Sequence, residues 1–238
     1  MPELQQLIDD LVAANHILYH HGVVDGYGHA SIRHPQKPDH FLIAAAIAPG
    51  RVQASDVLEL DLDGNTVDGQ DRPVYSERFI HAEVYRARAD VNAVIHSHSP
   101  TVIPFSVTDV PLRPIINQAS CLHSGVPVYN SRLVPEATSP LVDTPAVGKA
   151  LVAKLAEHSV VLMRGHGNTV VAPDIREAVT RAIYTERNAL LLLQTLALNR
   201  PIEYLDPTEV QHKNAGRQNL PNHGVDRIWQ MWIDEVNA

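Results

Sequence analysis

The sequence has little cysteine, few large aromatic residues and no long apolar run. Its single cysteine, Cys121, cannot form a disulfide within the chain, which favours a reducing, cytoplasmic setting. No window reaches the roughly 18 uninterrupted apolar residues of a membrane-spanning helix. The N-terminus, MPELQQLIDDLVAANHI, places acidic residues within its apolar pattern, which is not typical of a signal peptide. We therefore expect no membrane partner.

Positive charge is also scarce. The chain has 19 Lys and Arg residues against 27 Asp and Glu residues, a formal net charge of −8. Nucleic-acid binding depends on a basic surface, so no nucleic-acid partner is expected. With 45% hydrophobic and 19% charged residues, the composition is that of a globular protein and excludes disorder as the main state. We predict one domain over residues 1–238.

Helical and strand patterns interleave along the chain without a linker rich in Pro, Gly or Ser. Apolar periodicity predicts helices over 3–21, 76–88, 145–157, 173–198 and 225–236. Alternating or continuous apolar runs predict strands over 30–33, 41–44, 56–61, 91–98, 160–163 and 170–172. Ser76 is the predicted N-cap of the second helix. Few strand pairs are joined by clean helical crossovers, so the pattern indicates a three-layered α/β fold without a wholly parallel sheet.

Histidine is abundant, with 14 residues. His96 and His98 stand two residues apart where a predicted strand ends, so their imidazoles point the same way and can bind one ion. His166 lies between two glycines after another apolar strand, where the backbone can turn sharply. Three imidazoles with an open position are typical of catalytic metal sites. Each motif alone also occurs at histidines that bind no metal, and their combination favours a metal site.

Glu77 begins the helix that precedes the His96 strand. Its carboxylate is a candidate fourth, exchangeable metal ligand, or alternatively an acid/base beside the ion. His81, one helical turn later, either faces the site or packs against the next strand, and we expect packing. Gly26 and Gly28 lack the third glycine and helix of a dinucleotide-binding loop, so NAD is not expected.

In their order and spacing, these motifs resemble the class II aldolase and adducin family over residues 5–200. The resemblance rests on Gly28–Arg33 (GHASIR), Ser76-Glu77, Asp90–His98 (DVNAVIHSH) and Arg164–Gly167 (RGHG). It implies a three-layer α/β/α sandwich around a mixed, largely antiparallel sheet. It also implies a divalent metal held by three residues, with Glu77 as a further ligand or acid/base. The implied metal-binding histidines are His96, His98 and His166.

The resemblance further implies a homo-oligomer, a tetramer with its site at a subunit interface. The C-terminal tail, residues 202–238, is then expected to contact a neighbouring subunit. His223 in this tail is a candidate substrate contact.

The departures from the family's sugar-phosphate aldolases affect the substrate. In those enzymes the first loop has the pattern Gly-Asn-x-Ser, and here His29 occupies the position of the asparagine. A later loop contains Thr-Gly, whereas residues 45–50 of this chain contain no threonine. Their glutamate follows a Ser-Ser pair, which is Tyr75-Ser76 in this chain. A phosphate dianion needs several donors in a small space. Much of that set is missing here, which disfavours a sugar-phosphate substrate.

This pattern resembles the family's metal-dependent decarboxylases of hydroxylated aromatic or heteroaromatic acids, such as dihydroxyphthalate and hydroxypyridine-dicarboxylate decarboxylases. The resemblance implies a small hydroxy acid chelated by the ion, an enolate that the metal stabilises as a Lewis acid, and proton delivery by Glu77 or His29. Zinc is expected first, although manganese and cobalt suit the same ligands. Ser76 and three arginines that are either structural or bind a second carboxylate complete the candidate substrate contacts: Arg33, Arg78 and Arg164.

Two other functions remain open. One is an aldolase or epimerase acting on a non-phosphorylated hydroxy-carbonyl compound. The other is a non-catalytic, adducin-like interaction module, which we would expect to lose its metal ligands, whereas all of them are present here. Bound metal in the purified protein would discriminate between an enzyme and such a module.

Overall fold

A single seven-stranded sheet organises the computed structural model, which describes residues 4–67, 69, 71–206, 208–210 and 223–237. The strand order is β3-β2-β1-β4-β7-β6-β5. Neighbouring strands are antiparallel except β5 and β6, which are parallel, so the prediction of a mixed, largely antiparallel sheet is confirmed. The strands are β1 (His29–Arg33), β2 (His40–Ala44), β3 (Val57–Asp61), β4 (Ala93–Ser97), β5 (Val128–Tyr129), β6 (Val160–Met163) and β7 (Gly167–Ala172).

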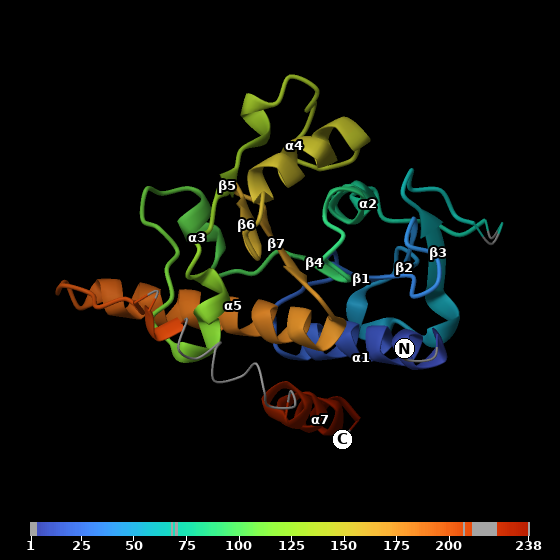
Figure 1. The fold of residues 1–238 in the computed structure, drawn as a ribbon. Helices are drawn as coiled ribbons and strands as arrows, with labels where there is room; N and C mark the ends of the chain where they lie inside the picture. Colours follow the sequence, from blue (N-terminus) through green and yellow to red (C-terminus); the bar gives the residue numbers. More distant parts are fainter. Residues whose placement is uncertain (1–3, 68, 70, 207, 211–222, 238) are drawn as a thin grey trace.

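Helices cover both faces of this sheet and make the predicted three layers (Figure 1). One face carries α1 (Leu4–His20) and α5 (Ile175–Ala197), and the other carries α2 (Arg78–Ala87) and α4 (Pro145–Leu155). The short helix α3 (Ile103–Ser106) and four 3-10 turns lie in the connections. The turns are Pro49–Arg51, Ala54–Asp56, Asn117–Leu122 and Ser131–Leu133.

Strand alternation decides which side chains reach each layer. Successive side chains of a strand point to opposite faces. In β4, Ala93 and Ile95 belong to the core beneath α1 and α5, whereas Val94 belongs to the core beneath α2 and α4. His96, two residues after Val94, therefore lies on the α2 side. In β1, Ala30 and Ile32 likewise face the α1 layer. The side chains of His29 and Ser31 therefore point toward α2.

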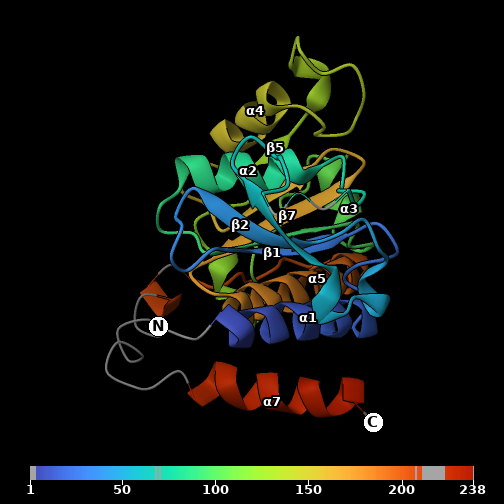
Figure 2. The ribbon, with the colours of Figure 1, turned by 90° about the vertical axis from the view of Figure 1, so that its right-hand side faces the viewer.

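The C-terminal helix α7 (His223–Asn237) packs beneath α1 and α5 of the same chain (Figures 1 and 2). Trp229 and Trp232 are 2% and 0% exposed there, and the His21 ring lies 5.2 Å from the Trp232 ring. The predicted last helix is thus present. The side chain of His223 lies outside the described residues, and a contact between the tail and a neighbouring subunit stays a prediction.

The start of α2 differs from the sequence expectation. We predicted Ser76 as the N-cap, but the helix begins at Arg78 and its N-cap position is Glu77, with no side-chain cap. The Glu77 side chain is instead turned toward the histidine rings described below. By contrast, Asp174 caps α5 by accepting from the Glu177 N–H, and Thr144 caps α4 by accepting from the Val147 N–H.

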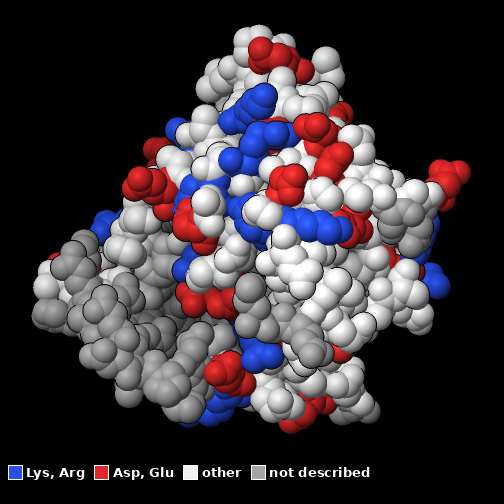
Figure 3. All heavy atoms as spheres, turned by 45° about the vertical axis from the view of Figure 1, so that its right-hand side comes forward, with Lys and Arg blue, Asp and Glu red and all other residues white. Residues whose placement is uncertain are grey.

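Acidic and basic side chains are interspersed on the face drawn in Figure 3. Ion pairs of this kind join Arg86 to Asp63 and Arg88 to Asp90, each with a nitrogen–oxygen distance of 2.7 Å. In the described part of the chain, no helix combines the length and apolarity that a bilayer crossing requires.

Candidate metal centre and its cavity

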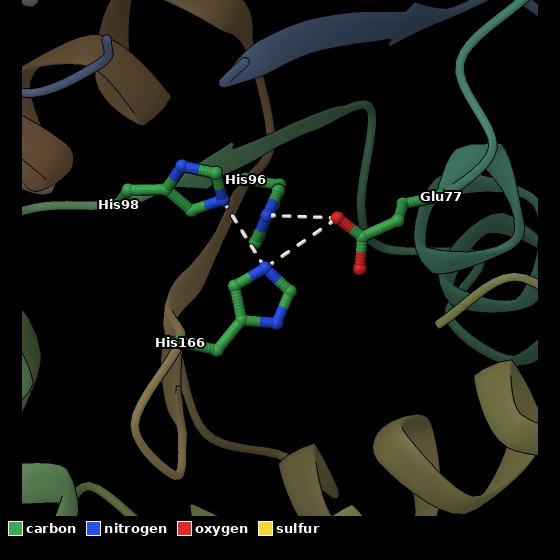
Figure 4. A group of neighbouring side chains, drawn as sticks. All are labelled: Glu77, His96, His98 and His166. Carbon is green, nitrogen blue, oxygen red and sulfur yellow. Dashed lines mark hydrogen bonds and ion pairs between the residues drawn. The ribbon is translucent and has the colours of Figure 1, made fainter. Parts of the chain in front are cut away.

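The structure brings together the four residues that the sequence indicated as metal ligands (Figure 4). One ligand atom from each of Glu77, His96, His98 and His166 lies within 4.8 Å of the others. The Nε2 atoms of His98 and His166 are 3.1 Å apart. Glu77 Oε2 lies 3.5 Å from the Nε2 atoms of both His96 and His166. Segments far apart in the sequence thus converge on one point.

Backbone geometry at β4 and β7 places two of these rings. The strands pair antiparallel up to Ser97 opposite Asn168, so His98 and His166 leave neighbouring strand ends. Gly165 adopts a φ of 63° in the turn between β6 and β7, a conformation that favours glycine. At Gly167 the two backbones approach so closely that a Cβ atom would lie 2.0 Å from the Ser97 carbonyl oxygen.

Replacing Gly167 by alanine is therefore expected to lower the free energy of unfolding by about 3 kcal/mol, because the added methyl group must force β4 and β7 apart. Urea unfolding of the variant beside the wild type measures this change. Gly26→Ala is a suitable control, since its Cβ would have no described neighbour within 4 Å. Equal stability of Gly167→Ala and wild type would contradict the close packing.

Hydrogen bonds to the second ring nitrogen of two histidines and to the second carboxylate oxygen of Glu77 orient the candidate ligand atoms toward one another. His96 Nδ1 lies 3.2 Å from the Asn168 carbonyl oxygen, and His98 Nδ1 lies 3.1 Å from Asp25 Oδ2. Such contacts leave Nε2 free to bind an ion. Glu77 Oε1 accepts from the Val142 N–H at 2.9 Å, so its Oε2 is the oxygen that faces the rings.

The donor set fits a divalent ion. His96 Nε2 is fully buried and has no hydrogen-bond partner among the described residues. The His98 and His166 nitrogens face each other at hydrogen-bond distance. Three imidazole nitrogens and one carboxylate oxygen around a shared point are a suitable ligand set for zinc and for several other divalent metals.

Electrostatics hold the Glu77 carboxyl ionised. Burial acts to raise the pKa of Glu77, but His166 and His96 outweigh burial and leave that pKa well below its usual range. Burial lowers the pKa of His96, despite the opposing effect of Glu77. The pKa of His166 is raised, because Glu77 outweighs the effect of burial there. An ionised Glu77 beside a neutral His96 is the combination that coordinates a metal.

A cavity of about 820 Å³ opens beside this group. Its polar edge includes His98, His166 and Glu77, and its apolar wall includes Ile47, Val74, Tyr75 and Leu141. The Tyr75 hydroxyl donates to the Ile47 carbonyl, and burial raises the pKa of Tyr75 to about 12. A lining that combines candidate metal ligands with apolar side chains suits a flat organic molecule with chelating oxygens on one side.

Two further predicted residues, His29 and Ser76, line the cavity. The His29 ring lies 4.5 Å from the Tyr75 ring and 5.1 Å from the His96 ring. Next to it lies His81, for which we preferred packing against a strand over facing the site. His81 does lie stacked near Phe41, but both of its nitrogens also form hydrogen bonds, one of them to His29.

The three arginines do not share this placement. Arg33 donates to the carbonyl oxygens of Val91, Pro38, Tyr85 and Arg88. Arg78 donates to the carbonyl oxygens of Gly64 and Tyr75. Both guanidinium groups brace loops and neither lines this cavity, which agrees with the structural alternative, and a role of either arginine in substrate binding stays a prediction. Arg164 is exposed beside Gly165 and its role stays a prediction.

Sequence reasoning missed Asp25, whose carboxylate contacts His98. Replacing Asp25 by asparagine is expected to weaken metal affinity by about 10- to 100-fold, because the amide is a poorer partner for an imidazole N–H. Competition with a chromogenic chelator measures this affinity. Asp39→Asn, at an exposed residue before β2, serves as the control. An unchanged affinity would exclude a supporting role for Asp25.

Comparisons with known proteins agree with this geometry. Residues 9–193 match the model of the Class II Aldolase and Adducin N-terminal domain. The chain is 35% identical to the decarboxylase tropJ of Talaromyces stipitatus, covering 95% of this chain and 92% of that protein. It is 30% identical to the 3,4-dihydroxyphthalate decarboxylase of Arthrobacter keyseri, covering 93% and 94% respectively. An aldolase II superfamily protein from Pseudomonas syringae has the same fold, with a TM-score of 0.82, 24% identity and coverage of 99% and 94%.

Proposed function

The chain belongs to the class II aldolase and adducin family, and from this premise we propose that it is a divalent-metal-dependent decarboxylase of a hydroxylated aromatic or heteroaromatic acid. Similarity to two decarboxylases over nearly the whole chain supports decarboxylation. One observation carries the proposal for this site. The candidate metal-binding group opens onto a cavity lined mainly by apolar surface, whereas a sugar phosphate would need a cluster of hydrogen-bond donors.

The residues divide the chemistry between them. His96, His98, His166 and Glu77 would hold the ion, which as a Lewis acid supplies stabilisation of the negative charge that develops as carbon dioxide leaves. The apolar wall covers the ring of the acid and excludes water from it. The ring carbon then takes up a proton, and Glu77 and His29 are the two groups that we propose for its delivery.

Zinc is the ion that we propose first, with manganese and cobalt as alternatives for the same ligands. We also propose a homo-oligomer, a tetramer as in the family resemblance. Exposed apolar side chains on the C-terminal half of α5 and directly after its end support an association surface, namely Leu190, Leu191 and Leu198.

The test is carbon dioxide release from a panel of ortho-hydroxy aromatic acids. The protein is assayed as purified, after chelation, and after addition of zinc, manganese or cobalt. We expect release that chelation abolishes and one ion restores. If metal is bound but no acid releases carbon dioxide, decarboxylation is wrong, and aldol cleavage of a non-phosphorylated hydroxy-carbonyl compound becomes the better proposal for the same metal group.

A further inference from the structure

A buried chain of hydrogen bonds runs from α2 to the cavity. His29 Nδ1 lies 2.6 Å from His81 Nε2, and His81 Nδ1 lies 2.5 Å from Ser31 Oγ. The Ser31 hydroxyl in turn lies 2.8 Å from the Tyr85 hydroxyl. All four residues are at most 2% exposed. His29 lines the cavity, so this residue connects the series of hydrogen bonds to any molecule bound there.

Tyr85, at the end of the series of hydrogen bonds farthest from the cavity, decides which group donates in each bond. A phenol hydroxyl has one proton to donate, and the side-chain acceptor beside the Tyr85 hydroxyl in the described structure is Ser31 Oγ. If Ser31 donated to Tyr85 instead, the Tyr85 proton would lose this acceptor, and an unsatisfied buried donor costs about 1–3 kcal/mol. We therefore orient the Tyr85 hydroxyl toward Ser31, and the Ser31 hydroxyl then donates to His81 Nδ1.

The direction continues through the two imidazoles. Burial lowers the pKa of His81 to about 3, which keeps this ring neutral. A neutral imidazole has one donor and one acceptor nitrogen. Since His81 Nδ1 accepts from Ser31, His81 Nε2 donates to His29 Nδ1. The proton of a neutral His29 then resides on Nε2, the nitrogen that the chain leaves free for a ligand.

We infer that His29 presents a fixed neutral N–H to an oxygen of the substrate, and that Tyr85, Ser31 and His81 are positioning residues that set its tautomer. This inference rests on the proposed decarboxylation and narrows it. His29 stabilises the developing oxyanion through a hydrogen bond. Glu77 then remains as the proposed carrier of the proton for the ring carbon, and because its carboxyl group is ionised it must first take up that proton, from the hydroxyl group of the substrate or from water.

Nitrogen-15 NMR of histidine-labelled protein tests the tautomer without any substrate. Signals of His29 are identified by their loss in His29→Gln. We expect a proton on Nε2 in the wild type and a mixture of tautomers in Tyr85→Phe, which lacks the donor that orients the chain. The matched control is Tyr129→Phe, because Tyr129 is also a buried tyrosine of the α2 and α4 core but its hydroxyl has no partner among the described residues.

Turnover provides the second measurement. Tyr85→Phe is expected to lower kcat about tenfold with KM nearly unchanged, because the donor acts mainly in the transition state. His81→Leu should lower kcat about 100-fold, whereas His81→Gln, whose amide can still donate to His29, should recover part of that loss. Metal content is expected to stay unchanged in all three variants.

The outcomes separate the two proposals. A wild-type His29 protonated on Nδ1, or equal tautomer populations and kcat in Tyr85→Phe and Tyr129→Phe, would overturn the inferred chain. By contrast, a wild-type protein with the expected tautomer that releases carbon dioxide from no acid would overturn the proposed function and, with it, the assignment of His29 to that substrate.

Discussion

His166→Ala is expected to lose the bound ion and to lower kcat/KM for the decarboxylated acid by about 10⁴-fold. His166 Nε2 lies 3.1 Å from His98 Nε2 and 3.5 Å from Glu77 Oε2, so its removal opens the ligand group at its centre. The remaining ligands would bind a divalent ion weakly and leave the developing negative charge without its main stabilisation. Elemental analysis of the purified variant measures the ion, and carbon dioxide release measures the rate.

A matched control separates this effect from general damage. His20→Ala removes an exposed imidazole at the end of α1, far along the chain from the ligand group. We expect its metal content and rate to equal those of the wild type. Should His166→Ala retain one ion per chain and a rate within tenfold of the wild type, His166 would not be a metal ligand.

Glu77→Gln is expected to lower kcat about 10³-fold, within the range of general acid–base catalysis. The amide has nearly the shape of the carboxylate and can still accept from the Val142 N–H, so the fold should be preserved. It lacks the negative charge that faces His96 and His166 and cannot exchange a proton near neutral pH. Metal affinity should fall much less than the rate, because three imidazoles remain.

The rate of carbon dioxide release measures kcat, and competition with a chelator measures the metal affinity separately. Glu83→Gln is the control, since Glu83 is also a buried glutamate of the α2 segment but pairs with Arg86. If Glu77→Gln keeps a kcat within threefold of wild type, Glu77 neither delivers the proton nor holds the ion in its active form.

Local patterns in the sequence were sufficient to locate the histidines. The spacing of His96 and His98 reflects the two-residue period of a strand, and the glycines around His166 reflect a sharp turn. Both signals are contained within a few residues. The helix and strand patterns that interleave along the chain are local in the same sense, which is why the three layers could be predicted.

Long-range contacts were not accessible in this way. The predicted cap at Ser76 was wrong because Glu77 is fixed by Val142, 65 positions later, and by rings of other strands. The sequence favoured the wrong one of two alternatives for His81 as its main role, since its hydrogen-bond partners lie 50 or more positions earlier in β1. For a related reason, the sequence could not decide between the structural and the substrate-binding interpretation of the arginines. Proximity in sequence to a site residue does not tell which carbonyl oxygens a long side chain will reach.

The wide separation of the proposed metal ligands in the sequence would link ion binding to the folding equilibrium. His96 and His98 stay close in an unfolded chain, whereas Glu77 and His166 meet them only after α2 and the β6–β7 turn have docked on the sheet. An ion that prefers the complete set therefore binds the native state far better than the unfolded state. By mass action, a free ion concentration 100 times its dissociation constant would add about 2.7 kcal/mol to the unfolding free energy. The melting temperature would then report occupancy of the centre, even where no substrate is known.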